Sequence, residues 1–212
     1  TLFHLLFSYR FKSLILNTTN MIVEIPLFGA GINYFPTEIS VLRVFEPRYL
    51  LLIGDSIKNN TVFGVGKNLT EIGQIVSEVK IIDHKDISNA EQIVVVECTG
   101  LIKTLEISSD DEYPTSKGEI ISDIGLPPTE DELVSLQKNI SRGVGKMIEQ
   151  GLDIDLPNFE IDTTNRILKL WELTSKIPMS DDLRSKIIYE NDLIKRYKIL
   201  KNYVSKVNDL EF

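Results

Sequence analysis

Hydrophobic residues between Met21 and Ile124 occur in short β-branched runs, and this pattern predicts strands joined by turns. Gly, Pro, Asn and Asp separate the runs, as in chains that pass repeatedly from strand to turn. Two of the expected strands are long, so we expect a bend or bulge near Gly100 and a small closed or half-closed barrel. The expected strands are Ile22–Ile25, Ile39–Val44, Thr61–Gly66, Ile72–Asp83, Gln92–Glu106 and Gly118–Ile124.

One helix is expected within this β-rich half. Pro47 suits the first helical position, Tyr49–Ile53 supply an apolar face, and the polar residues 58–60 end the helix. Glu46 lies directly before the helix, where a carboxylate interacts favourably with the helix dipole. The expected order is therefore strand, helix, strand at this point of the chain.

After the Pro-Pro pair at 127–128 the hydrophobic spacing changes to that of helices. Thr129 and Glu132 have the spacing of a capping box and begin a helix that should reach about Gln150. The chain is therefore expected to have an α+β fold, in which an α-helical bundle follows the β-rich half. Further helices are expected over Thr163–Lys176 and from Ser180 to Val204, the latter broken near Asn191.

Composition and charge narrow the function classes. With 212 residues, 42% hydrophobic and 25% charged, the chain is long enough to bury an ordinary core. The net charge of -8 repels polyphosphates and anionic lipids, so we expect neither nucleic-acid nor membrane binding. Cys98 is the one cysteine, and no Cys/His group has the spacing of zinc ligands. We therefore expect a cytoplasmic protein without metal or cofactor.

Residues 1–20 differ from the rest of the chain. They are rich in Leu and Phe, but Arg10 and Lys12 interrupt the apolar run, which is too short for a membrane span of about twenty apolar residues. Because the patterned sequence begins at Met21, we interpret residues 1–20 as a tail or an over-extended gene start. The alternative is the remnant of an anchor or signal segment.

Motifs that would carry catalysis are incomplete. Residues 64–67 (GVGK) and 142–146 (RGVGK) contain Gly-Lys pairs, but neither has the spacing of the phosphate-binding loop G-x-x-x-x-G-K-[ST]. We interpret the first as a hairpin turn, and the glycines of the second as sites of close helix packing or a kink. A Ser-His-Asp triad would depend on His84, which lies in a polar segment that we expect to be a solvated turn. The sequence thus predicts no catalytic residue.

Three short strings, in order along the chain, resemble the start of a known protein family. They read EIPLFG at residues 24–29, YFP at 34–36 and LRVFEPRY at 42–49. These strings are similar to the first strand, the turn and the strand-to-helix junction of the N-terminal substrate-binding domain of Lon proteases. Val94–Ile107 and Leu183–Val204 are similar to later segments of that family, so the resemblance covers Met21 to about Asn208.

The chain departs from the family pattern at two places. Gly29 stands where the family usually has Pro, which we expect to loosen a turn. Lys103 and Thr104 stand where an Arg and an aromatic residue are common, so a contact made by that pair does not carry over. The LRVFEPRY string, which is the most specific of the three, matches throughout.

The resemblance implies a fold and a role. The fold is a PUA-like β pseudo-barrel with one inserted helix over residues 21–125, followed by a helical domain over 126–212. The role is that of a non-catalytic module, detached from ATPase and protease parts, which captures unfolded or tagged polypeptides for a protease or chaperone. RNA binding is the alternative, because PUA-like barrels also occur in RNA-modifying enzymes, but the acidic charge and the lack of a Lys/Arg stripe between aromatic residues oppose it.

Arg43, Glu46, Arg48 and Tyr49, in the last of these strings, are the candidate binding residues. One interpretation is architectural, because a strand-to-helix junction needs charges that satisfy exposed backbone groups. In the other, Arg43 and Arg48 line a groove for acidic or backbone groups of a client. An extended client would pair with a sheet edge and place side chains in an apolar groove between the two halves. The oligomeric state stays open.

Overall fold

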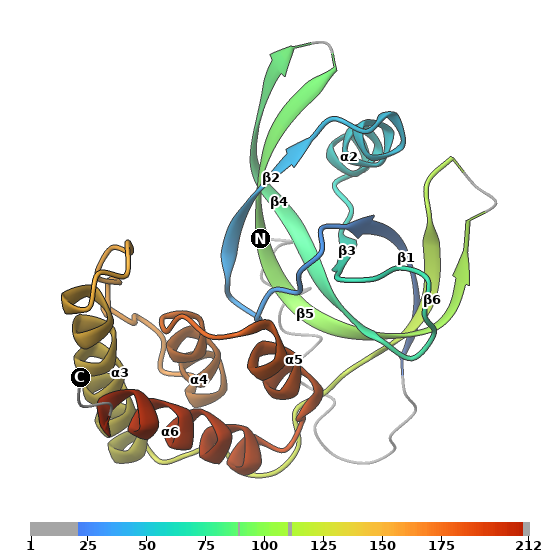
Figure 1. The fold of residues 1–212 in the computed structure, drawn as a ribbon. Helices are drawn as coiled ribbons and strands as arrows, with labels where there is room; N and C mark the ends of the chain where they lie inside the picture. Colours follow the sequence, from blue (N-terminus) through green and yellow to red (C-terminus); the bar gives the residue numbers. More distant parts are fainter. Residues whose placement is uncertain (1–20, 89, 110–111, 210–212) are drawn as a thin grey trace.

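The β-branched runs of the first half form one curled sheet in the computed structural model, which describes residues 21–88, 90–109 and 112–209 (Figure 1). The strands are β1 (Ile22–Gly29), β2 (Ile39–Val44), β3 (Phe63–Gly66), β4 (Ile75–Ser88), β5 (Glu91–Ser108) and β6 (Thr115–Ile120). Their order is β2-β5-β4-β3-β1-β6, and β6 also pairs with β5. This second pairing closes the sheet and confirms the expected pseudo-barrel. The expected tail at residues 1–20 lies outside the described residues.

The long strand β5 makes the closure, because it pairs with β2 and β4 along its first part and with β6 along its last. Its pairing with β4 shifts register where Glu78 faces Gly100 and Val79 faces Cys98. An extra residue at such a point bends and twists a strand, so the bend expected near Gly100 is confirmed. The outer end of the β4–β5 hairpin projects beyond the barrel (Figure 1).

The inserted helix is α2 (Pro47–Asn59), and it packs on the barrel core. Pro47 is at the helix start, as expected, and Asn60 ends the helix in a left-handed conformation. Tyr49 and the apolar residues of the next turn are buried against side chains of several strands. The Glu46 side chain makes no capping hydrogen bond to the helix.

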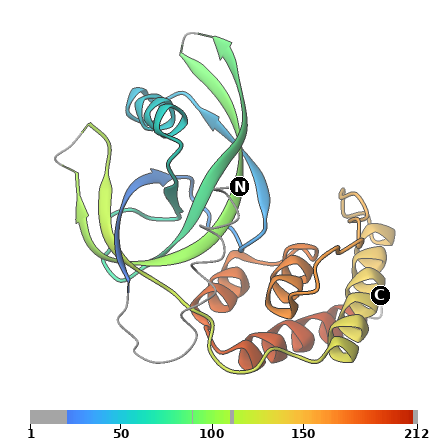
Figure 2. The same ribbon diagram turned by 180° about the vertical axis from the view of Figure 1, so that it is seen from behind.

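The second half is helical, as predicted, and lies on one side of the barrel, away from the projecting hairpin (Figure 2). The capping box is present, because Thr129 and Glu132 exchange hydrogen bonds at the start of the first of these helices. The break expected near Asn191 separates the last two. None of the helices in the described ranges is long and apolar enough to cross a membrane. The helices are α3 (Glu130–Glu149), α4 (Arg166–Ser175), α5 (Asp181–Tyr189) and α6 (Leu193–Asp209).

The two Gly-Lys segments, residues 64–67 and 142–146, lie in different kinds of secondary structure. A Cβ atom on Gly143 would lie 3.2 Å from a Val207 methyl group, so this glycine of α3 allows close packing against α6, as predicted. The hairpin turn predicted at residues 64–67 is wrong, because Phe63–Gly66 are buried and form β3. Here the glycines make room for large neighbouring side chains rather than for a turn. His84 is exposed, but it lies on β4 and not in a turn.

The two halves meet through a buried apolar cluster. Phe35, Ile75 and Leu101 of the β half pack against Trp171 and Ile187 of the helical half, with other apolar side chains around them. The Phe35 and Trp171 ring centroids are 5.9 Å apart. Side chains therefore fill this contact, where the sequence suggested a groove for a client.

A buried arginine supports the same contact. Arg196 of α6 is fully buried, and its guanidinium lies 3.8 Å from the Trp171 ring centroid. It makes a 2.7 Å ion pair with Asp123, whose carboxylate also accepts a 3.2 Å hydrogen bond from the Trp171 indole N–H. Because Asp123 lies in the segment between β6 and α3, this group fixes the connection between the halves.

We predict that Gly118→Ala destabilises the barrel. Gly118 of β6 pairs with both β1 and β5, and a Cβ atom there would lie 2.3 Å from an Ile102 methyl carbon and 3.0 Å from the Lys103 carbonyl oxygen. The free energy of unfolding should fall by about 1–3 kcal/mol in urea denaturation, as for other overpacked sites.

Gly54→Ala is the matched control. Gly54 lies on the exposed face of α2 with open space around it, so alanine should leave stability unchanged or raise it by roughly 0.5–1 kcal/mol. Equal urea midpoints of unfolding for Gly118→Ala and Gly54→Ala would contradict the close packing at Gly118.

Candidate functional site

β2 is an edge strand, and its backbone has one side without a strand neighbour in the described part of the chain. The Cys98 N–H donates to the Glu38 carbonyl just before β2. In the antiparallel register, this bond determines which residues of β2 hydrogen-bond β5. Alternate residues of such a pair exchange hydrogen bonds, and the residues between them point their N–H and C=O groups away. The even-numbered residues of β2 thus bond β5. The N–H and C=O groups of Ile39, Val41 and Arg43 are directed to the free side.

A pocket of about 300 Å³ lies beside this free edge. Its walls come from the end of β1, the loop after it, β2 and the start of α2. The buried side chains of Phe28, Tyr34, Leu42 and Tyr49 supply an apolar lining, while Phe45 is exposed at the rim. Polar groups, among them Arg43 and Glu46, share this lining with the apolar side chains, and such a mixed concavity can hold a ligand.

Arg43 lies at the rim of the pocket, as the binding interpretation requires. Its side chain is 70% exposed and makes an ion pair with Glu91 at the start of β5. The hydrogen bond to Glu91 raises the pKa of the Arg43 guanidinium, so this group is charged at any physiological pH. Inside the pocket, burial raises the pKa of the Tyr34 hydroxyl, which therefore stays neutral.

Of the other three candidate residues, two have the position that the binding interpretation requires and one fits the architectural interpretation. Glu46 and Tyr49 line the pocket, whereas Arg48 does not. Arg48 makes a 2.8 Å ion pair with Glu46 and lies 4.6 Å from the Tyr49 ring centroid, on the exposed surface of α2. Thus Arg43, Glu46 and Tyr49 come together at the pocket, and Arg48 supports two of them from outside.

Sequence reasoning missed several residues of the site, above all Phe28, Tyr34 and Val41. Phe28 and Tyr34 stand in the strings that carry the family resemblance, but nothing local marks them as pocket residues. Val41 and Ile39 carried a usable signal, because they are apolar residues on the exposed face of a strand. Their exposed fractions are 60% and 61%. Such residues beside a free edge indicate an interaction surface.

Gly29 does not loosen a turn, contrary to the expectation from the family pattern. It is the last residue of β1, and its N–H donates a 3.0 Å hydrogen bond to the Tyr49 hydroxyl. A Cβ atom on Gly29 would lie 2.9 Å from that hydroxyl oxygen. The Phe28 and Tyr49 ring centroids are 4.3 Å apart. Glycine thus lets α2 approach β1 closely, and proline would lack the hydrogen-bond donor.

We predict that Tyr49→Phe lowers the free energy of unfolding by about 1–2 kcal/mol, because the part-buried Gly29 N–H loses its acceptor while the ring packing stays. Chemical denaturation measures the change. Arg48→Ala is the control, since its ion pair with Glu46 is exposed and should contribute less. An equal loss in both variants would contradict the role given to the Tyr49 hydroxyl.

Comparison with known proteins agrees with this architecture. The chain is similar to the structure of the Lon N-terminal domain protein from Xanthomonas campestris, with a TM-score of 0.63 and 20% identity, over 85% of this chain and 98% of that chain. It is also similar to the N-terminal domain of the Mycobacterium avium complex Lon protease, with a TM-score of 0.62 and 12% identity, over 86% of this chain and 98% of that chain. Comparison with curated protein sequences finds no match. The family model for the ATP-dependent protease La (LON) substrate-binding domain matches residues 24–206, so the chain belongs to the Lon substrate-binding domain family, as its opening strings predicted.

Proposed function

We propose that this chain binds an extended stretch of polypeptide along the free edge of β2, with one client side chain in the neighbouring pocket. The observation that carries the proposal is the arrangement of β2, whose odd-numbered residues direct their N–H and C=O groups away from β5 beside a pocket with a mixed apolar and polar lining. An added strand satisfies such groups through its own main chain. Family membership supports a substrate-binding role.

The geometry of strand addition explains how one site accepts many sequences. Main-chain hydrogen bonds do not depend on the client's side chains, so they supply affinity without selectivity. Alternate side chains of an added strand fall on opposite faces of the sheet. One set would reach the pocket, and the other would lie beside the exposed side chains of Ile39 and Val41. We therefore expect weak, promiscuous binding of unfolded segments, with one preferred position.

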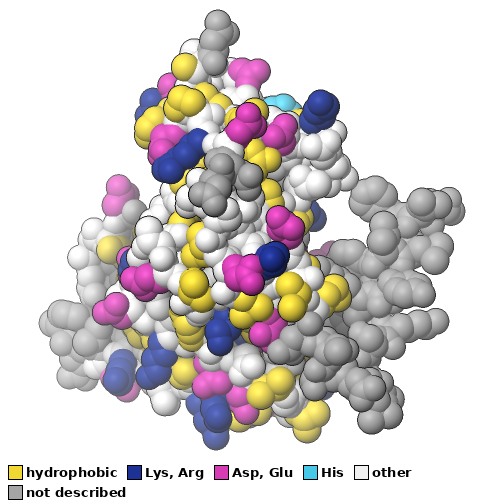
Figure 3. All heavy atoms as spheres, turned by 90° about the vertical axis from the view of Figure 1, so that its right-hand side faces the viewer, with side chains coloured by type: hydrophobic (Ala, Val, Ile, Leu, Met, Phe, Trp, Pro, Cys, Tyr) yellow, Lys and Arg dark blue, Asp and Glu magenta, His cyan; other side chains and the backbone are white. Residues whose placement is uncertain are grey.

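The charges around the site favour a polypeptide over RNA. Arg43 is paired with Glu91, and Arg48 is paired with Glu46, so each cation has a carboxylate beside it. Phosphate binding depends on cations whose charge is not already neutralised. On a different face, the right-hand side of Figure 1, Lys and Arg side chains are scattered among Asp, Glu and apolar side chains and form no continuous stripe (Figure 3). These observations support the first of the two functions suggested by the sequence.

The proposal extends to what happens to a bound client. The matched family is named for the substrate-binding part of an ATP-dependent protease. We assign no catalytic role to the pocket, because the two charged residues that line it, Arg43 and Glu46, are each held in an ion pair. In this proposal the protein acts in the cytoplasm as an adaptor, and a separate protease or chaperone receives the client.

We predict that Val41→Pro weakens peptide binding with little change in stability. Proline removes the Val41 N–H, which points to the free side, and leaves the bonds to β5 in place. Fluorescence anisotropy with a short labelled peptide of Val and Thr residues around one central Phe should show a loss of about tenfold, as expected for one main-chain hydrogen bond and a blocked edge.

Val41→Thr is the matched control, because it keeps the N–H and the β-branched shape and should bind like wild type. N-methylation of the peptide supplies a second test. Methyl groups on alternate amides should abolish binding in one register and spare it in the other, since only one set of N–H groups faces β2. Equal binding by both methylated peptides, or by Val41→Pro and Val41→Thr, would rule out strand addition.

A further inference from the structure

The loop between β1 and β2 contacts the pocket on one side and the helical half on the other. The side chain of Tyr34 lines the pocket. The next residue, Phe35, is fully buried and faces the helical half, where it packs near Trp171. One short segment thus carries a pocket wall and part of the contact between the two halves.

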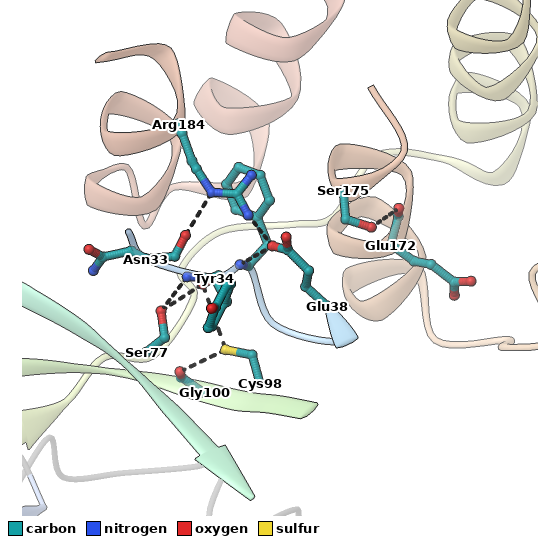
Figure 4. A network of polar contacts seen from close by, with 10 residues as sticks. Asn33, Tyr34, Glu38, Ser77, Cys98, Gly100, Glu172, Ser175 and Arg184 are labelled. Carbon is teal, nitrogen blue, oxygen red and sulfur yellow. Dashed lines mark hydrogen bonds and ion pairs between the residues drawn. The ribbon is translucent and has the colours of Figure 1, made fainter. Parts of the chain in front are cut away.

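A single side chain of α5 holds this segment on both sides of Tyr34 (Figure 4). The Arg184 Nε donates a 2.6 Å hydrogen bond to the Asn33 carbonyl oxygen, and its guanidinium makes an ion pair with Glu38. The same guanidinium lies 4.1 Å from the Phe35 ring centroid. The side chains of Arg184 and Glu38 are only 15% and 21% exposed, so solvent screens this pair weakly. Arginine alone supplies such a planar, multiply bonded contact.

The sheet holds the backbone of Tyr34 itself. The Ser77 hydroxyl accepts a 2.8 Å hydrogen bond from the Tyr34 N–H and donates one of 2.8 Å to the Tyr34 carbonyl oxygen (Figure 4). Glu38 also accepts a 2.8 Å hydrogen bond from the Phe35 N–H, so the carboxylate that Arg184 binds is part of the loop's own turn. Ser77 therefore fixes one point of the loop, and Arg184 fixes the residues around it.

The turn after Tyr34 has a conformation that needs such support. Thr37 has a φ of 75°, which β-branched residues rarely adopt. Its buried hydroxyl oxygen has no hydrogen-bond partner among the described residues. Strained residues of this kind persist where surrounding contacts over-determine them. Removal of the Arg184 contacts would therefore let the turn relax and move the neighbouring wall of the pocket.

We propose that Arg184 is a positioning residue of the polypeptide site. It holds the 33–38 segment so that Tyr34 shapes the pocket for a large apolar side chain. The helical half thereby sets the selectivity of a site whose walls all belong to the β half. This inference rests on the proposed function, because the selectivity concerns the client side chain that enters the pocket.

The test compares two short labelled peptides of Val and Thr residues that differ only in a central Phe or Ala. Arg184→Met keeps the aliphatic stem and removes the polar contacts. Arg184→Lys keeps a charge for Glu38 but cannot also bond the Asn33 carbonyl in the same geometry. Lys67→Met is the matched control, because it removes an exposed 3.2 Å ion pair with Asp181 of α5 and leaves the Arg184 contacts intact.

We expect wild type and Lys67→Met to prefer the Phe peptide. In Arg184→Met, affinity for the Phe peptide should fall on the order of tenfold, because a displaced wall forfeits much of an anchor contact, while affinity for the Ala peptide stays the same. The affinity of Arg184→Lys for the Phe peptide should lie between those of wild type and Arg184→Met. A general loss of stability would weaken both peptides equally, so the Phe/Ala ratio separates positioning from folding. An unchanged ratio in folded Arg184→Met would overturn the inference.

Hydrogen exchange gives a readout that does not depend on the client. The N–H groups of Tyr34, Phe35, Thr37 and Glu38 are all hydrogen-bonded. They should exchange faster in Arg184→Met and keep their wild-type rates in Lys67→Met. Wild-type protein that binds neither peptide would refute the proposed function. Unchanged exchange in Arg184→Met would refute the positioning role by itself.

Discussion

The pairing of β5 with strands on two sides of the barrel is the constraint on which the rest of the structure depends. β5 bends, so that its last part reaches β6 and closes the sheet, while its first part continues outward with β4 and β2. Because closure is made by β6, the strand β2 is left with a partner on one side only. The free edge, the pocket beside it and the candidate binding surface all follow from where the barrel closes.

The helical half is attached to this barrel by contacts that go beyond apolar packing. Arg196 is buried with two guanidinium nitrogens, Nε and Nη1, that have no partner among the described residues. Burial of a charged group is costly unless it is paired, and here Asp123 and the face of Trp171 offset part of that cost. Arg184 makes another polar attachment, through the Asn33 carbonyl oxygen and the Glu38 carboxylate. Two arginines from different helices thus help to fix the orientation of the halves, one at the linker and one at the 33–38 segment.

Local patterns predicted most of the elements but little of the site. The capping box at Thr129 and the helix start at Pro47 were correct because their signals lie within a few neighbouring residues. The segment 64–67 was misread as a turn, since two glycines suggest flexibility when the large side chains that press on them are unseen. The pocket depends on which strand edge is left unpaired. The unpaired edge depends on how strands far apart in the sequence pair, so no single segment of the sequence predicts it.

The short length of β2 limits the residence time of a segment bound at its free edge. The strand is six residues long, and only every second residue is available to a guest, so few bonds hold any segment that docks there. Dissociation rates depend steeply on the number of such bonds, and residence times should be brief. So short an edge also offers little length for edge-to-edge pairing between copies of the chain.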